Sequence, residues 1–352
     1  MASIPAIPLA AELVTQWERV VREVPDGSAR EHEAAVELYH AALSLALEMW
    51  FEKGDPSGPA FTEWEHPWRK FGGDNPGTVY ATAPLDATAR YRITGDVPDA
   101  RYVGIQVYTR GAGYNAPSAN VGDEALAIDS AGRFSVELGG EAPGDARPWV
   151  PLVEGDYLVM VRVYRREVFG PPPQLRIEQT VPGSGAAPTV DQRAATATAF
   201  FREAVLSTIS VTEVLRAGGA NAYPAPDAPV HRPEYTGALF PTLDNVYDGC
   251  WVDLGPGELL EVRGHLPQAR YSSFVWYDRW FATPDYRRAR CFRTSDDLVV
   301  DPDGSYTLLV GPDDPGHPNW IDTDGLSQGI FAIRCLLPQE RSLPELRVVR
   351  SG

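Results

Sequence analysis

Residues 243–280 read LDNVYDGCWVDLGPGELLEVRGHLPQARYSSFVWYDRW, and residues 73–110 contain an earlier version, GDNPGTVYATAPLDATARYRITGDVPDARYVGIQVYTR. Six residues of the earlier stretch recur in the later one at a constant offset: Gly95, Pro98, Ala100, Arg101, Tyr102 and Tyr108 return as Gly264, Pro267, Ala269, Arg270, Tyr271 and Tyr277. Shared turn formers and an Ala-Arg-Tyr triplet in one register indicate an internal duplication. We therefore predict two related units in this chain.

Each half begins with a helical pattern and continues with short runs of strand character. Apolar residues recur at helical spacing in residues 10–24, 28–51 and 189–218. Ser28 is the expected N-cap of the second helix, and Thr189 or Asp191 that of the third. The strands that follow are separated by Gly, Pro and Asp, and several alternate apolar and polar residues. Later strands also match across the halves, with Arg162 equivalent to Arg334.

This pattern predicts a mainly β fold with helical segments, in which a unit made of a helix and an antiparallel, jelly-roll-like β-sandwich is duplicated in tandem. We expect an N-terminal helix in residues 1–27, the first repeat in 28–181, a linker in 182–190 and the second repeat in 191–352. Gly95 and Gly264 should occupy matching turns. Trp149 and Trp320, which share a position, should pack in the sandwich cores. Neither half has a βαβ array, which argues against a Rossmann or TIM-barrel fold.

The composition limits the partners. The chain has 48 acidic and 31 basic residues and a net charge of -17, which repels phosphate backbones and anionic membrane surfaces. The three cysteines form no CxxC pair, so neither a zinc site nor a disulfide framework is indicated. No signal peptide or membrane-length apolar run is recognisable, so we expect a cytoplasmic protein. The expected partner is a small-molecule substrate, without a cofactor, and a homo-oligomer stays open.

Residues 301–336 contain Asp303-Gly304-Ser305, Val310-Gly311-Pro312 and Asn319-Trp320 in order. This stretch resembles domain-of-unknown-function family 1214, in which an Asp-Gly-Ser turn and a strand precede Asn-Trp and a terminal apolar strand. The first half, from Asp74 through Tyr80 to Tyr102, is more loosely similar to the partner family 1254, although the acidic residue of that family's Asn-x-Asp-Thr-x-Tyr motif is missing. The resemblance covers most of residues 60–350. It implies a β-rich fold and brings no established reaction.

The duplication offers a way to sort polar residues. Those that recur in both halves, such as Arg101 and Arg270, are expected to be framework, whereas those found in one half are better candidates for a site. By this rule Asp278, Asp322 and His317 are the predicted catalytic residues, because their side chains transfer protons. The predicted substrate-binding residues are Arg279, which can hold an oxyanion, together with Trp280, Trp276, His66, Trp68, Arg69 and Tyr80.

Each of these residues also has a structural explanation. Asp278 and Arg279 can form a strand-end ion pair, Asp322 is a natural turn residue, and His317 lies in a loop. No metal site is predicted, because His66, His231, His265 and His317 lack ligand-like spacing. No P-loop, nucleophile elbow or zinc-protease motif is present.

The sequence therefore supports two hypotheses of function. The first is an enzyme doing acid–base chemistry, a hydrolysis or elimination, on a small neutral polar or glycosidic substrate in an aromatic-lined pocket. That makes it a possible hydrolase or lyase. The alternative is a non-catalytic carbohydrate- or metabolite-binding protein that uses the same aromatic residues. For the first hypothesis, Asp278, Arg279, His317 and Asp322 should face one cavity together with part of the 64–70 loop.

Overall fold

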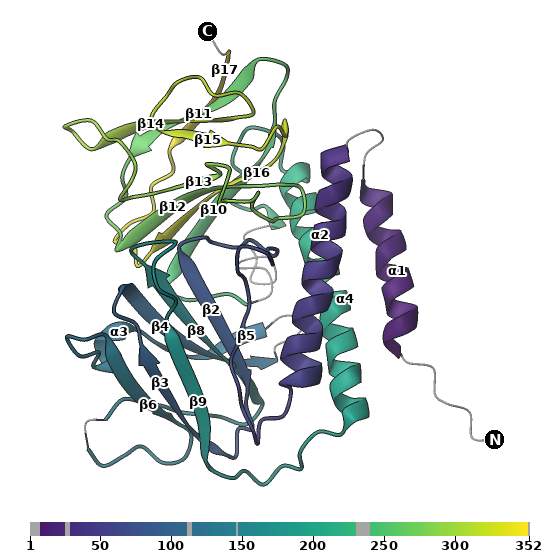
Figure 1. Ribbon diagram of the computed structural model, residues 1–352. Coiled ribbons are helices and arrows are strands. Elements are labelled where there is room, and N and C mark those ends of the chain that lie inside the picture. Colours follow the sequence, from purple (N-terminus) through teal and green to yellow (C-terminus); the bar gives the residue numbers. More distant parts are fainter. Residues whose placement is uncertain (1–7, 25–28, 111–114, 146, 230–239, 351–352) are drawn as a thin grey trace.

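A computed structural model describes residues 8–24, 29–110, 115–145, 147–229 and 240–350 (Figure 1). The helices are α1 (Pro8–Glu23), α2 (Ala29–Ala46) with its π-helical continuation η1 (Leu47–Glu52), the short α3 (Asp123–Leu126) and α4 (Val190–Ala217). No helix among the described residues is both long and apolar enough to cross a membrane. The strands of the described residues form four sheets, which pair into two sandwiches.

The first sandwich contains two sheets. One has the strand order β1 (Thr62–Glu63), β2 (Thr78–Pro84), β8 (Asp156–Arg165), β4 (Ala100–Arg110) and β5 (Asn115–Val121). The other has the order β7 (Trp149–Val150), β6 (Arg133–Leu138), β3 (Arg90–Asp96) and β9 (Gln174–Val181). Their facing side chains, among them Tyr91, Ile93, Val103 and Val161, form one buried cluster.

The second sandwich repeats this arrangement. One sheet has the order β10 (Asn245–Asp253), β16 (Gln328–Leu336), β12 (Tyr271–Tyr277) and β13 (Phe292–Thr294). The other has the order β15 (Trp320–Asp322), β14 (Ser305–Gly311), β11 (Glu258–His265) and β17 (Glu345–Arg350). The two strand orders agree position by position, apart from the additional β1. The predicted duplication of an antiparallel sandwich with helical segments is confirmed.

Gly95 and Gly264 occupy matching positions, but these are in strands rather than in the predicted turns. Gly95 lies in β3 opposite Phe134, and Gly264 lies in β11 opposite Tyr306. A Cβ atom on Gly95 would overlap the Phe134 ring, and one on Gly264 would lie 2.8 Å from Pro344. Both glycines therefore recur because a neighbouring side chain crosses closely over the backbone.

The helices form a layer beside both sandwiches (Figure 1). Thr189 caps α4 through a capping box with Gln192, as the sequence predicted for one of two residues, while the expected cap Ser28 lies outside the described residues. Although α4 opens the second predicted repeat, it packs against α1, α2 and η1. One buried cluster joins Leu38 of α2 and Phe201 of α4 to residues of both sandwiches, such as Tyr108 and Trp280. The helical layer is therefore shared by the two units.

Trp149 and Trp320 also occupy equivalent places. The indole of Trp149 donates to the carbonyl of Gly139 at 3.0 Å, and that of Trp320 donates to the carbonyl of Gly311 at 3.0 Å. Trp320 is 9% exposed, whereas Trp149 is half-buried. Each indole therefore connects a short edge strand, β7 or β15, to the end of the neighbouring strand, β6 or β14.

We predict that Trp320→Ala lowers the free energy of unfolding by about 3–5 kcal/mol, because it removes a large buried side chain and its hydrogen bond. Trp149→Ala should cost less, because part of its indole already contacts solvent. Urea denaturation of both variants checks this order. Equal midpoints for Trp320→Ala and the wild type would show that Trp320 contributes no core packing.

Candidate functional site

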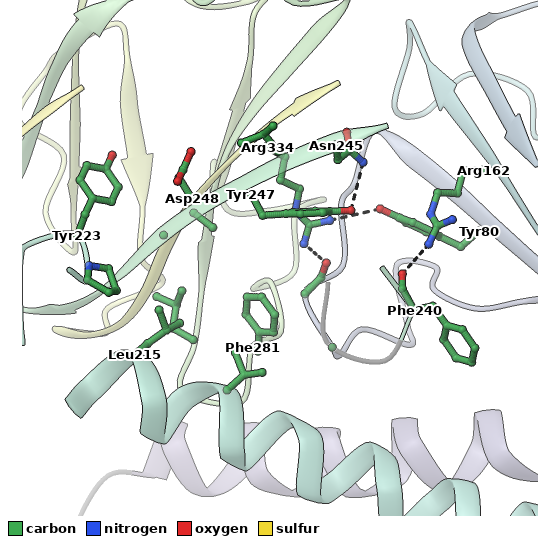
Figure 2. Close-up of a pocket in the computed structure, with 18 of the residues that line it drawn as sticks. Tyr80, Arg162, Leu215, Tyr223, Phe240, Asn245, Tyr247, Asp248, Phe281 and Arg334 are labelled. Atoms are coloured by element: carbon green, nitrogen blue, oxygen red, sulfur yellow. Dashed lines mark hydrogen bonds between the residues drawn. The ribbon is translucent and has the colours of Figure 1, made fainter. Parts of the chain in front are cut away.

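A pocket of about 410 Å³ lies where the two sandwiches meet α4. Strands β2 and β8 of the first unit and β10 and β16 of the second line it, together with segments 64–73 and 223–226 and the α4 residues Val211 and Leu215. Figure 2 shows Tyr80, Tyr247 and Arg334 along one wall. Leu215 of α4 and Phe281, which follows β12, face them. The pocket is therefore built by both copies of the repeat.

Two buried arginines on equivalent strands dominate the polar wall. Arg162 of β8 is 2% exposed and Arg334 of β16 is 7% exposed. Tyr80 lies directly across from Arg162 in the sheet register, and Tyr247 lies directly across from Arg334. The Arg162 guanidinium lies 5.8 Å from the centre of the Tyr80 ring, and that of Arg334 lies 5.5 Å from the Tyr247 ring. Both distances are in the cation–π range.

Each arginine reaches the chain segment that leads into the first large strand of the other unit. One guanidinium nitrogen of Arg162 donates to the carbonyl of Phe240 at 2.7 Å, and one of Arg334 donates to the carbonyl of Gly73. Two tyrosines that recur in the sequence do the same one residue later. The hydroxyl of Tyr108 donates to the carbonyl of Pro241 at 2.8 Å, and that of Tyr277 donates to the carbonyl of Asp74 at 2.8 Å.

The remaining contacts of the two guanidinium groups are with neutral side chains. Arg162 donates to the amide oxygen of Gln106, and Arg334 donates to the hydroxyl of Tyr80 at 3.3 Å. The Nε atom of each arginine is buried and makes no hydrogen bond within the described residues. Within this part of the chain, neither arginine forms an ion pair with a carboxylate. The pocket wall therefore carries two buried positive charges without a carboxylate in direct contact.

The buried aspartates at this junction are engaged elsewhere. Asp244 accepts hydrogen bonds from Tyr102 at 2.8 Å, Gln106 at 3.0 Å and Asn120 at 2.6 Å, all in the first unit. Its counterpart Asp74 accepts from the backbone N–H of Thr283 in the second unit at 2.8 Å, and from the Thr283 hydroxyl. These reciprocal contacts hold the units together and leave the two carboxylates without direct contact to the pocket arginines.

Glu65 is a carboxyl group in the pocket wall that is influenced by the charges of Arg334 and Arg162. Its Oε2 atom is buried and has no hydrogen-bond partner within the described residues, and the carboxyl accepts the backbone N–H of Asn75. Burial, followed by the nearby charge of Asp74, raises the Glu65 pKa well above its usual range, against the opposing effect of Arg334. At the other end of the pocket, Asp248 is paired with Arg341. The pocket therefore contains a carboxyl group whose pKa is raised, chiefly by burial.

The predicted residues at the end of β12 form a structural turn. Asp278 is 3% exposed, and its Oδ1 accepts the backbone N–H groups of Trp280 at 2.8 Å and Ala282 at 3.2 Å. Arg279 is paired with Glu31 of α2 at 3.1 Å, and its guanidinium donates to the Glu23 carbonyl. Trp280 is buried in the cluster shared with the helices. These three residues anchor the helical layer and do not line the pocket.

The other predicted residues of the second unit also lie away from the pocket. Trp276 is fully buried in the core of its sandwich. The imidazole of His317 accepts the backbone N–H of Asn319 at 3.1 Å, and Asp322 accepts that of Asp324 at 2.8 Å. Asp322 belongs to β15, in the sheet β15-β14-β11-β17. The pocket is lined instead by β10 and β16 of the other sheet of the second unit. The predicted convergence of Asp278, Arg279, His317 and Asp322 on one cavity is not seen in this pocket.

In the 64–70 loop, Arg69 is 6% exposed and paired with Glu48 of η1 at 2.7 Å, so it holds the loop against the helices. Trp68 is 74% exposed and lies under the guanidinium of Arg287 at 5.0 Å, with His66 beside it. The loop contributes Trp64 and Glu65 to the pocket. Among the residues singled out from the sequence, Tyr80 lines the pocket.

Arg162, Arg334, Tyr247 and Glu65 line the pocket but are not among the site residues predicted from the sequence. The first two recur in both halves, and the rule that recurrent residues are framework set them aside. In this structure the two arginines hold the units together and also line the pocket, because a site between two repeats is built from equivalent positions of both repeats. Glu65 belongs to a loop without a close counterpart in the second half, so the same rule could have found it. Within the described residues, no group of three or more His, Cys, Asp or Glu side chains is placed to hold a metal ion.

The fold and site define a tandem β-sandwich protein with a pocket between its repeats. The profile of the family described as "Protein of unknown function (DUF1214)" matches residues 80–167 and 247–340, more than half of the chain. The chain belongs to this family, and both of its sandwiches contribute to the match. The looser likeness of the first half to family 1254 stays a prediction. No curated protein matches the chain.

Two solved structures share this architecture. A putative uncharacterized protein from Burkholderia cenocepacia has a TM-score of 0.86 at 22% sequence identity, covering 97% of this chain and 95% of its own. A protein from Vibrio parahaemolyticus has a TM-score of 0.53 at 14% identity, covering 96% of this chain and 100% of its own. At these identities the likeness concerns the fold.

The pH dependence of stability tests the structural role of Asp278. Burial raises its pKa to about 7, so the folded protein holds this proton more tightly than the unfolded chain. Stability from this group is therefore complete below about pH 4 and is lost as the pH rises toward 7. We expect Asp278→Asn, which keeps an acceptor oxygen, to be more stable than the wild type at pH 8 by about 1–3 kcal/mol, since one pKa unit corresponds to about 1.4 kcal/mol.

Urea denaturation between pH 4 and pH 8 provides the measurement, and Asp285→Asn is a control of opposite sign. The hydrogen bond from Arg287 lowers the Asp285 pKa to about 2, so Asp285 stabilises the fold above about pH 4 and its removal should not help at pH 8. If the profiles of Asp278→Asn and the wild type run parallel, Asp278 is ionised in the folded protein.

Proposed function

We propose that this protein binds a small organic anion with an apolar body in the pocket between its two sandwiches. The observation that carries this proposal is the pair Arg162 and Arg334, two buried guanidinium groups in the pocket wall without a carboxylate partner among the described residues. A buried charge is costly unless it is paired, and a planar guanidinium matches the geometry of a carboxylate. A ligand carboxylate would supply the missing partner.

The remaining lining favours an apolar body on the same ligand. Val211 and Leu215 of α4, Phe281, and Ile330 and Ala332 of β16 contribute apolar surface. The unneutralised guanidinium of Arg334 lies beside Tyr80 on one side of the pocket, as Figure 2 shows, whereas the charges of Asp248 and Arg341 at the other end are paired with each other. A pocket with an apolar wall and a few convergent polar groups is the usual form of a small-molecule site. Because the two arginines have no carboxylate partner among the described residues, they favour an anion over the neutral or glycosidic substrate that the sequence suggested.

An acid–base enzyme remains the second candidate, and Glu65 is the observation that favours it. The carboxyl lines the pocket with one oxygen unpartnered among the described residues, and burial raises its pKa, which makes it a better proton donor candidate than an exposed carboxylate. In such an enzyme Glu65 would replace Asp278, His317 and Asp322 as the acid–base residue. Conversion of a bound ligand that stops in Glu65→Gln while binding persists would support catalysis, and recovery of every ligand unchanged would leave the binding function.

A panel of carboxylates with matched amides tests the binding proposal. Calorimetric titration with phenylacetate, 4-phenylbutyrate and octanoate should show binding of at least one acid. Its amide should bind about 10-fold or more weakly, because the amide cannot pair with the guanidinium groups and a 10-fold loss corresponds to about 1.4 kcal/mol. Equal affinity of acid and amide, or no binding of any acid, would contradict the proposal.

A variant that fills the pocket locates the bound molecule. Ala332→Leu adds apolar volume to the lining of β16 without removing a polar group, and should weaken binding of the best acid about 10-fold or more. Ala199→Leu makes the same change on the exposed side of α4 and should leave binding unchanged. Thermal unfolding of both variants shows whether the fold is retained. Equal binding by Ala332→Leu and the wild type would place the ligand elsewhere.

A further inference from the structure

We infer that Glu65 takes part in ligand recognition as a neutral carboxylic acid, donating its O–H to the same anionic group that the pocket arginines attract. This inference rests on the proposed function and adds to it the residue that makes binding depend on pH. A site of this kind recognises the ionised form of an organic acid with both positively charged and neutral donors. The ligand class is therefore a carboxylate, or an anion of similar shape, that can accept two different donors.

The position of Glu65 provides the first support. Glu65 lies two residues after the end of β1. The intervening residue, Trp64, donates its backbone N–H to the Tyr80 carbonyl at 2.7 Å. Glu65 therefore lies beside the strand that carries Tyr80, and it lines the pocket together with Arg162 and Arg334. The buried Oε2 atom accepts no hydrogen bond from the described residues, although buried carboxylate oxygens are normally satisfied. A protonated oxygen that donates to a ligand would satisfy it.

The charges around Glu65 explain why it can stay neutral beside two arginines. Neither guanidinium lies within ion-pair distance of it in the described part of the chain, and the ionised form would stand next to Asp74. The titratable and charged groups that face Glu65 come from several elements: Asp74 before β2, Tyr80 of β2, Arg162 of β8, Tyr277 of β12, Tyr286 after β12 and Arg334 of β16. Burial and Asp74 together outweigh the arginines and raise its pKa.

The consequence for binding has a definite sign. A ligand carboxylate beside an ionised Glu65 would place two negative charges in a poorly solvated site, which is unfavourable. Above the pKa of Glu65 in the free protein, binding should therefore take up one proton, and the affinity should fall about 10-fold for each unit of pH. Below that pKa the affinity should not change with pH, because the proton is already in place.

Three variants separate this role from a merely structural one. Glu65→Gln keeps the shape and an N–H donor but has no titrating proton, so it should bind nearly as well as the wild type and lose the pH dependence. Glu65→Ala removes the donor and should bind about 10-fold more weakly at pH 6. Glu63→Gln, an exposed neighbour on the same segment, is the matched control and should behave as the wild type.

The experiment measures the affinity for the tightest carboxylate of the panel, between pH 6 and pH 9, by calorimetric titration. The infrared difference between the wild-type and Glu65→Gln complexes reports whether the Glu65 carboxyl is protonated. A protonated carboxyl, with Glu65→Gln binding like the wild type and Glu65→Ala binding weakly, supports the inference. An ionised carboxylate in the complex, or equal loss of binding in Glu65→Gln and Glu65→Ala, overturns it.

These outcomes differ from a failure of the proposed function. If no carboxylate in the panel binds to the wild-type protein, the anion-binding proposal fails, and the inference about Glu65 fails with it. If carboxylates bind to the pocket while Glu65 is ionised or has no effect, the binding function stands and the role of Glu65 is wrong.

Discussion

The structure depends on a reciprocal contact in which an arginine of each sandwich binds the backbone that leads into the other sandwich. Arg162 holds the Phe240 carbonyl, and Arg334 holds the Gly73 carbonyl. Both arginines are buried on central strands, so their positions are fixed by the sheets. A buried guanidinium requires several acceptors, and these backbone carbonyls lie in segments without strand pairing of their own. The junction is therefore as specific as the interior of either sandwich.

The same contact creates the conditions for a binding site. Because the arginines are satisfied by carbonyls, an amide and a hydroxyl, their charge is not neutralised by direct contact with a carboxylate in the described residues. Departures from symmetry then shape the space between them. The first half has three additional residues between Asn75 and Val79, relative to Asn245 and Val246, and among the described residues β1 followed by Glu65 has no equivalent in the second half. The pocket thus combines symmetric charge with an asymmetric carboxyl group.

The helical layer completes this arrangement. The anchoring turn Asp278–Trp280 binds the layer to the second sandwich through Glu23 and Glu31, and Arg69 binds η1 to the first sandwich through Glu48. Leu215 of α4 then forms part of the pocket wall. Arg279 and Trp280, predicted from the sequence to bind substrate, therefore anchor the helical layer, and the Arg279 carbonyl accepts a hydrogen bond from Thr212 of α4, the helix that closes one side of the site. The buried polar character of this turn has a structural cause, because a turn packed under helices must satisfy its own backbone groups.

The sequence by itself determined the duplication and the sandwich architecture, and it limited the cap of α4 to Thr189 or Asp191, because these features depend on local patterns. Turn formers, alternating strands and a Thr-x-x-Gln capping box act over a few residues, and the repeat shows them twice. Only the tertiary structure decided which polar residues share a pocket. Arg162 and Arg334 are far apart in the chain and were matched as equivalent residues, yet nothing local shows that equivalent positions face one another across a junction. Asp322 and Asp278 both come at the ends of short apolar runs. In the structure Asp322 lies in β15, at the edge of the sheet β15-β14-β11-β17, whereas Asp278 is buried in the turn after β12, beneath the helices. Such placement depends on how sheets and helices pack, and that packing follows from contacts between distant segments.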